Sequence, residues 1–175
     1  MRKIYILSIL IFSCSTEPEQ LSLDCTDIDG NDYATVQIGN QLWMSENLKT
    51  THYNNGDEIP NPSHEDWGSF DEGQYCVYDN DSANVEVYGN LYNWAAATDD
   101  RGVCPENFHV PTDEEYKELE MFLGMSESEA NSTGWRGTNE GSKLADGAEL
   151  WNNGNLENNS EFGTSGFSAF PGGYR

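Results

Sequence analysis

The clearest structural signal in this chain is the stretch Pro111-Thr-Asp-Glu-Glu-Tyr-Lys-Glu-Leu-Glu-Met-Phe-Leu-Gly124. Thr112 and Glu115 have the spacing of a capping box, in which each side chain satisfies a backbone amide of the first helical turn. The preceding proline blocks extension of the helix backwards, and glycine suits the position just past a helix end. The stretch therefore predicts a helix over residues 112–123. Its buried face carries apolar residues at helical spacing: Tyr116, Leu119 and Leu123.

Toward the N-terminus, two turn signals frame a strand hairpin. Asp29-Gly30-Asn31 lies between apolar runs, as hairpin turns do. Polar and apolar residues alternate over residues 33–38, which predicts a half-buried strand, and a turn at Gly39-Asn40 leads to a return strand at residues 41–44. Weaker patterns predict further short elements: strands at 75–78, 167–170 and from 174, a helix at 90–98, and one helical turn at 126–129.

Four aromatic-rich blocks follow one another in fixed order: residues 38–48, 88–94, 104–116 and 166–175. Together they resemble the Fibrobacter succinogenes major paralogous domain, a family of bacterial secreted and surface proteins, over roughly residues 27–175. The resemblance implies an α+β, C-type-lectin-like fold with two short helices, small antiparallel sheets and long ordered loops. The Pro-Thr-Asp-Glu-Glu-Tyr run is also similar to a signature of the formylglycine-generating enzymes, which share that fold.

The resemblance also carries an expectation about the end of the chain. Related domains continue past the Gly-Gly-Tyr-Arg that ends at Arg175, through further strands and a late cysteine. The chain is therefore expected to be C-terminally truncated, with an incomplete domain over residues 27–175 that lacks the final strands. Such a loss would leave an unpaired strand edge.

The N-terminus predicts export and lipidation. Basic Arg2 and Lys3 precede an apolar run at residues 4–12, which is far shorter than the roughly 20 residues of a membrane-spanning helix and is typical of a signal peptide. Cys14 then follows Ser13, as in a bacterial lipobox. We expect a signal peptide over residues 1–13, a lipidated Cys14 with a tether over residues 14–26, and an outer-membrane lipoprotein on the surface or periplasmic face. Ordinary signal cleavage with an incidental Cys14 is the alternative.

Composition excludes one class of partner. The chain has 31 acidic residues and a net charge of −23, and removing Arg2 and Lys3 leaves 31 acidic against 6 basic residues, a net charge of −25. A field of this sign repels phosphate backbones, so we expect no nucleic-acid binding. An aromatic content of 12% supplies enough apolar area for a folded core, which argues against disorder.

The cysteine count is odd once Cys14 is set aside. Cys25, Cys76 and Cys104 remain, and an oxidising compartment favours pairing. We predict a Cys25–Cys76 disulfide and an unpaired thiol at Cys104, although sequence alone leaves the other pairings open.

Catalysis is not expected. His52, His64 and His109 are scattered without metal-ligand spacing, no nucleophile–histidine arrangement is evident, and His109 lies in a block that favours core packing. No cofactor is predicted. Asp79 and Asp81 are weak calcium candidates because clustered carboxylates suit that ion, but a solvated turn is the favoured interpretation. The run at residues 27–32 favours a hairpin turn over a calcium loop.

The tryptophans divide into two groups. Trp43 and Trp94 lie in periodic segments and are expected in the core, whereas Trp67, Trp135 and Trp151 lie in loop-like stretches. Exposed aromatic rings beside amides are suited to sugar faces, so these three are candidate stacking residues, with burial under their own loops as the alternative. The leading hypothesis is a noncatalytic module that binds polysaccharide or another surface protein. A purely structural surface protein comes second, and an enzyme related to the formylglycine-generating type third.

Overall fold

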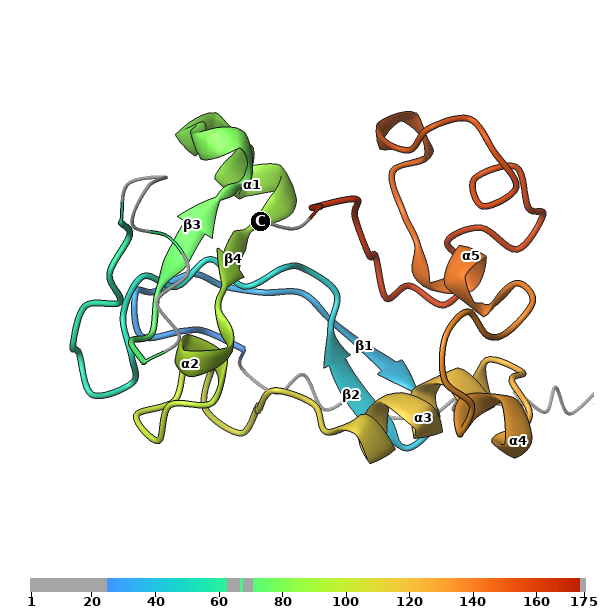
Figure 1. Cartoon of the computed structure of the whole chain (residues 1–175), viewed down its shortest axis with the longest axis horizontal. Helices are drawn as coiled ribbons and strands as arrows, with labels where there is room; N and C mark the ends of the chain where they lie inside the picture. Colours follow the sequence, from blue (N-terminus) through green and yellow to red (C-terminus); the bar gives the residue numbers. More distant parts are fainter. Residues whose placement is uncertain (1–24, 63–66, 68–70, 174–175) are drawn as a thin grey trace, which may run out of the picture.

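Two antiparallel hairpins and several short helices form the regular structure of this α+β chain (Figure 1). The computed structural model describes residues 25–62, 67 and 71–173. Within them lie the strands β1 (Thr35–Ile38), β2 (Gln41–Met44), β3 (Tyr75–Val77) and β4 (Asn90–Tyr92). The α-helices are α1 (Val85–Tyr88), α2 (Trp94–Ala97), α3 (Asp113–Phe122), α4 (Glu127–Ala130) and α5 (Glu140–Leu144). Short 3₁₀ turns are η1 (Tyr78–Asn80), η2 (Ser82–Asn84) and η3 (Ala148–Leu150).

The first hairpin, β1 with β2, confirms the strand and turn predicted from alternation. Thr35 lies opposite Met44 and Ile38 opposite Gln41, and the turn between them places Gly39 at a φ of 61°. A positive φ is readily adopted by glycine, which explains its position in the turn.

The second hairpin pairs β3 with β4, with Tyr75 opposite Tyr92 and Val77 opposite Asn90. Gly89 leads into β4 at a φ of 63°, and a Cβ atom there would lie 2.6 Å from the Cβ of Asn47. This close approach of two backbones requires glycine.

The strand predicted at residues 75–78 is confirmed, but the helix predicted at 90–98 is only half right. Residues 90–92 form β4, and α2 begins only after Asn93, whose Oδ1 accepts a hydrogen bond from Ala96 N at 2.9 Å. This cap fixes the helix start, and the backbone amide of Asn90 donates instead to Leu48 O.

The capped helix is confirmed as α3. Thr112 Oγ1 accepts from Glu115 N, and Glu115 Oε2 accepts from Thr112 N at 2.8 Å, so both halves of the capping box form. Leu119 is fully buried, and Gly124 follows at a φ of 121°. Ser126 and Glu129 repeat the motif at the start of α4, where one helical turn was predicted.

Two buried clusters form the core. The first joins β1, α3 and α5 and contains Ile38, Leu119, Leu123 and Leu144, with Val36, Trp43, Tyr116 and Phe167 packed against it. The second lies by the β3–β4 hairpin and contains Tyr53, Ile59, Ala96 and Val103, with Leu48, Tyr75, Tyr92 and Cys104 packed against it. In Figure 1 the helices α3, α4 and α5 lie on one side of the β1–β2 hairpin, and β3, β4 and α2 lie on the other.

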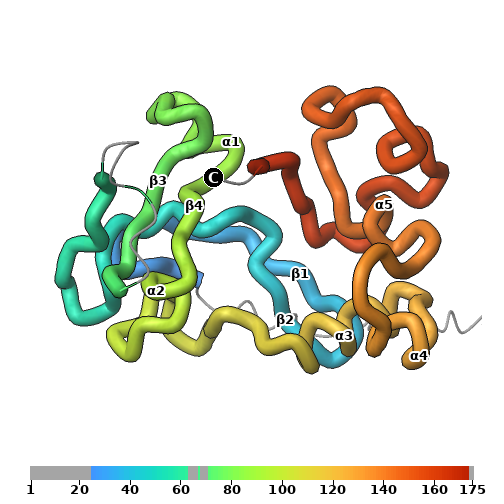
Figure 2. The backbone as a smooth tube through the Cα atoms, in the orientation of Figure 1, coloured from blue at the N-terminus to red at the C-terminus, as the bar shows by residue number. Residues whose placement is uncertain are grey.

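The first and last described segments pack without long strands. Residues 25–34 run beside residues 45–50 (Figure 2), where Ser45 N donates to Ala34 O. The strand predicted at residues 167–170 is reduced to one isolated parallel bridge between Ala145 and Ala169. The strand predicted from residue 174 lies outside the described residues. None of the helices in the described ranges has both the length and the apolar character needed to cross a bilayer.

Candidate functional site

Trp135 is the most exposed aromatic side chain among the described residues. It sits between Gly134 and Gly137, which have φ values of 86° and 80°, and its ring is fully exposed. The two glycines adopt positive φ values on either side of this short turn, in which Trp135 is exposed and Arg136 is partly buried. A bare indole ring has a large apolar area that water solvates poorly, so this position favours contact with a ligand.

A mixed polar cavity of about 420 Å³ begins at the residue after Trp135. We call it the polar pocket. Its walls come from α3, Met125, the segment 136–144 and the loop 155–159. The polar lining side chains are Glu120, Arg136, Thr138, Asn139, Glu140, Ser142, Asn155 and Asn159. The apolar ones are Tyr116, Met125, Leu144 and Leu156.

One wall of the polar pocket is fixed by an ion pair. Arg136 donates to Glu120 Oε2 from both Nε, at 3.2 Å, and Nη2, at 2.9 Å. Glu120 is buried on α3, and its carboxylate raises the pKa of Arg136. The pair holds the guanidinium in one orientation next to the exposed Trp135.

The second carboxylate of the pocket, that of Glu140, is hydrogen-bonded to backbone amides. Glu140 Oε2 accepts from Thr138 N at 2.7 Å and from Asn139 N at 3.2 Å. Burial by itself would raise the pKa of Glu140, but these amides and the nearby Lys143 outweigh it and lower the pKa. The anionic form of Glu140 is therefore favoured and shapes the pocket, which suits binding better than proton transfer.

The amide side chains of the pocket retain free hydrogen-bonding capacity. Asn159 Oδ1 accepts from Glu161 N at 2.9 Å, which leaves its NH₂ group available, and Asn139 Nδ2 donates to Glu161. Asn155 is exposed, and no described residue hydrogen-bonds to its side chain. The pocket thus offers amide donors and acceptors beside an aromatic ring.

The three tryptophans predicted to stack on a ligand fall in different environments. Trp135 is bare, as that prediction requires. Trp151 is half-buried, and its Nε1 donates to Asp146 O at 2.8 Å, so its ring anchors its own loop. Trp67 is half-buried, and its immediate neighbours lie outside the described residues. Neither Trp67 nor Trp151 lines the polar pocket.

Sequence reasoning missed Arg136, Glu120 and the asparagines as members of one site. Their signal was the Gly134-Trp-Arg-Gly137 run, because a tryptophan framed by glycines is placed on a turn. The asparagine-rich stretch at residues 152–159 carried a second signal.

Two core predictions for individual side chains are wrong. Trp94 is 80% exposed because it opens α2, and Asn93 caps that helix with the ring pointing away from the buried Ala96 face. His109 is also exposed, and its Nε2 lies 2.9 Å from Glu115 Oε1. Its place before the capping box made it a partner of the helix start instead of a core residue.

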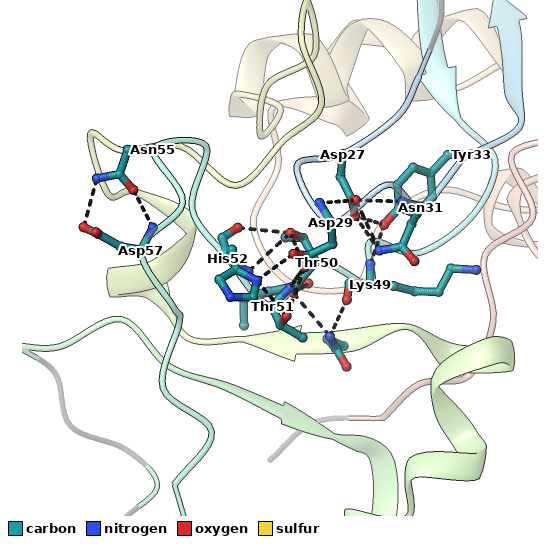
Figure 3. Close-up of polar contacts among 12 residues, drawn as sticks. Asp27, Asp29, Asn31, Tyr33, Lys49, Thr50, Thr51, His52, Asn55 and Asp57 are labelled. Carbon is teal, nitrogen blue, oxygen red and sulfur yellow. Dashed lines mark hydrogen bonds and ion pairs between the residues drawn. The ribbon is translucent and has the colours of Figure 1, made fainter.

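The run at residues 27–32 forms the predicted hairpin turn, and the carboxylates of Asp27 and Asp29 each accept several hydrogen bonds (Figure 3). Asp27 accepts from the backbone amides of Asp29 and Asn31, at 3.0 and 2.9 Å, and from Tyr33 Oη at 2.5 Å. These bonds occupy the lone pairs that a calcium ion would need.

Asp29 joins this turn to the segment at residues 50–52. Its Oδ2 accepts from Thr51 N at 2.6 Å and from Thr50 Oγ1 at 3.1 Å, and its Oδ1 lies 2.6 Å from His52 Nδ1 (Figure 3). His52 is thereby half-buried in a structural network. The arrangement ties the first described turn to the second core cluster.

The weak calcium candidates Asp79 and Asp81 are both exposed. Asp81 Oδ1 accepts from Ala83 N at 3.0 Å and caps η2, which is the behaviour of a turn residue. Within residues 25–62, 67 and 71–173, no three His, Cys, Asp or Glu side chains gather closely enough to hold a metal ion.

The cysteines lie in three settings. Cys25 and Cys76 are both buried, the first before the N-terminal turn and the second in β3. Cys104 is half-buried with a free thiol, and burial raises its pKa. The predicted Cys25–Cys76 bridge stays a prediction. Cys14 and the signal peptide lie outside the described residues.

No curated protein and no solved structure matches this chain. A family model does match it, over residues 36–175, which includes the β1–β2 hairpin, the capped helix α3 and the polar pocket. This chain therefore belongs to the family described as the Fibrobacter succinogenes major domain.

Proposed function

We propose that this chain is a noncatalytic module of the bacterial cell envelope, held by a lipid on Cys14, and that it binds neutral polysaccharide at the polar pocket beside Trp135. The proposal is carried by the fully exposed ring of Trp135, which is adjacent in sequence to Arg136 in the wall of a pocket rich in amides. Sugar rings present apolar C–H faces and hydroxyl edges. An exposed indole complements the first, and asparagine and arginine side chains complement the second.

The preference for a neutral polymer follows from charge. A net charge of −23 disfavours uronate-rich or sulfated chains by long-range repulsion. The C-type-lectin-like architecture implied by the family resemblance fits this proposal, because its long ordered loops present binding residues on a fixed scaffold.

Binding is favoured over catalysis because both carboxylates of the pocket already have hydrogen-bonding partners within the protein. Glu120 is paired with Arg136, and Glu140 accepts backbone amides. A general acid or base needs a carboxyl whose pKa is near the working pH, whereas the pKa of Glu140 is lowered.

The test is affinity electrophoresis and calorimetry against a panel of neutral and acidic polysaccharides. Trp135→Ala is expected to weaken binding at least about 10-fold, since buried tryptophans dominate interface energies. Trp94→Ala is the matched control, because that ring is 80% exposed but belongs to α2, which contributes no residue to the pocket, and it should leave affinity unchanged. Equal losses in both variants, or no binding by the wild-type chain, would favour a purely structural surface protein.

The anchor has its own test. Cys14→Ala is expected to abolish metabolic labelling with palmitate and to release the protein from membranes, because two or three acyl chains are needed for stable anchoring. A variant that still labels and fractionates with membranes would contradict lipidation at this residue.

A further inference from the structure

A second, larger cavity is lined by residues that pack against both core clusters. We call it the aromatic groove. Its volume is about 690 Å³, which lies within the range of small-molecule sites. β2 and β4 contribute to its walls, together with residues 103–111 and 167–170. Five aromatic rings line it: Trp43, Tyr92, Phe108, Phe167 and Phe170.

The charged side chains of the groove are acidic or histidine. Glu46, Glu115 and His109 line it, and no lysine or arginine does. Lys49 Nζ lies 3.7 Å from Glu46 Oε2 and 3.5 Å from Glu86 Oε2. One lysine thus serves two carboxylates, and the local net charge stays negative. Such a lining repels anionic ligands and attracts cations.

Asn90 lines the same groove, but its side-chain amide serves the fold. The residue is 8% exposed, and its Nδ2 donates to Lys49 O at 2.8 Å and to Thr50 O at 3.3 Å. These two carbonyls fix the orientation of the amide, because an exchange of its oxygen and nitrogen would place oxygen against oxygen. Among the described residues, no donor reaches Asn90 Oδ1. This oxygen has almost no accessible surface, so it is closed to an occupant of the groove, whose attraction for a ligand comes from its aromatic and acidic lining.

We propose that the aromatic groove binds an amphiphilic amine, a ligand with an apolar ring or chain and a protonated amino group. The aromatic rings would cover the apolar body, and cation–π contact with them adds to the attraction of the ammonium group. The carboxylates of Glu46 and Glu115 supply the negative charge that its ammonium group would meet. This site is separate from the polar pocket and does not depend on polysaccharide binding there.

The experiment compares two probes that differ in charge but not in ring system. 1-Naphthylmethylamine and 1-naphthoate are titrated into the full chain by calorimetry at neutral pH and two salt concentrations. The amine is expected to bind at least about 10-fold more tightly than the carboxylate. Ala97→Trp, which fills the groove from the end of α2, should remove amine binding. Ala148→Trp is the matched control, because Ala148 is exposed and lies outside the groove.

Glu46→Gln provides a variant that keeps the apolar lining and an oxygen for the amide of Ala34. It should weaken the amine and strengthen the carboxylate. Several results would overturn the proposal: equal affinity for both probes, amine binding that survives Ala97→Trp, or no binding at all. A concentration-dependent dimer abolished by Ala97→Trp would also overturn it, because the groove would then be filled by a second copy of the chain.

Discussion

Asp29 illustrates at the residue scale how one carboxylate holds two distant segments together. Burial raises its pKa, but hydrogen bonds from Thr51, His52 and Thr50 outweigh burial and lower it. Because the folded-state pKa lies below the ordinary value of 3.8, Asp29 stabilises the fold above about pH 4, and this contribution is lost as pH falls through the folded pKa. Asp29→Asn is therefore expected to cost about 1–3 kcal/mol at neutral pH and progressively less in acid.

Urea unfolding at pH values from 7 down to 3 measures this difference. Asp100→Asn is the control, since that aspartate is exposed and makes no described hydrogen bond, and it should track the wild type at every pH. A difference between Asp29→Asn and the wild type that is constant across the range would contradict the role given to the charge.

Sequence patterns predicted single residues well only where a local rule decided them. The turn at residues 29–31 and the cap at Thr112 depend on neighbours three or four positions away, and both are confirmed. Trp94 and His109 were misplaced because their exposure depends on which face of a short segment meets the core. That choice is made by residues distant in sequence.

Helix α3 shows at the element scale how one stretch divides between core and solvent. Leu119 is fully buried against Ile38, Leu123 and Leu144, whereas Phe122, three residues along the same helix, is 63% exposed. Leu119→Ala is expected to destabilise the fold by about 2–5 kcal/mol, through lost burial and the cavity left behind. Phe122→Ala should cost well under half as much, although it removes more atoms.

Urea or thermal unfolding of the two variants, monitored by circular dichroism, provides the comparison. The helix itself is retained in both, because alanine has the highest helix propensity. Equal destabilisation by the two substitutions would mean that the exposed ring of Phe122, which packs near Gly39, contributes as much as the core.

Elements with two independent signals were predicted correctly, whereas those with one signal were predicted with mixed success. The hairpin at residues 35–44 had alternation and a glycine turn, and α3 had a capping box and periodicity. Residues 90–98 had only apolar spacing, which a short strand followed by a helix satisfies equally well. Residues 167–170 form a single bridge to Ala145, because strand pairing depends on a partner that local sequence does not reveal.

At the scale of the whole molecule, family membership and the α+β class could be predicted, but neither cavity could. The polar pocket joins α3 to a loop some 35 residues later, and the aromatic groove joins β2, β4 and residues 167–170. Sites assembled from segments so far apart arise only when the two core clusters are in place. The exposure of Trp135 could be predicted from the sequence, because Gly134 and Gly137 on either side place it in a turn.

The same long-range assembly underlies the cysteine prediction. Cys25 precedes the turn whose Tyr33 accepts a hydrogen bond from Lys49 N, and Cys76 lies opposite Leu91 in the hairpin whose Asn90 donates to Leu48 O. Both buried cysteines thus belong to segments attached to residues 48–50. A Cys25–Cys76 disulfide would close a loop of about 50 residues, and such a crosslink stabilises by about 4 kcal/mol through the unfolded state.

We expect one titratable thiol, that of Cys104, when the full chain carrying Cys14→Ala is purified from an oxidising compartment and denatured without reductant. In the native protein this thiol should react slowly, since burial raises its pKa and only the thiolate is nucleophilic. Dithiothreitol should lower the melting temperature of this protein and of its Cys104→Ser variant by the same amount. It should have no effect once Cys25 and Cys76 are both serine. Three reactive thiols in the unreduced, denatured chain would show that the N-terminal turn and the β3–β4 hairpin are joined by packing and hydrogen bonds alone.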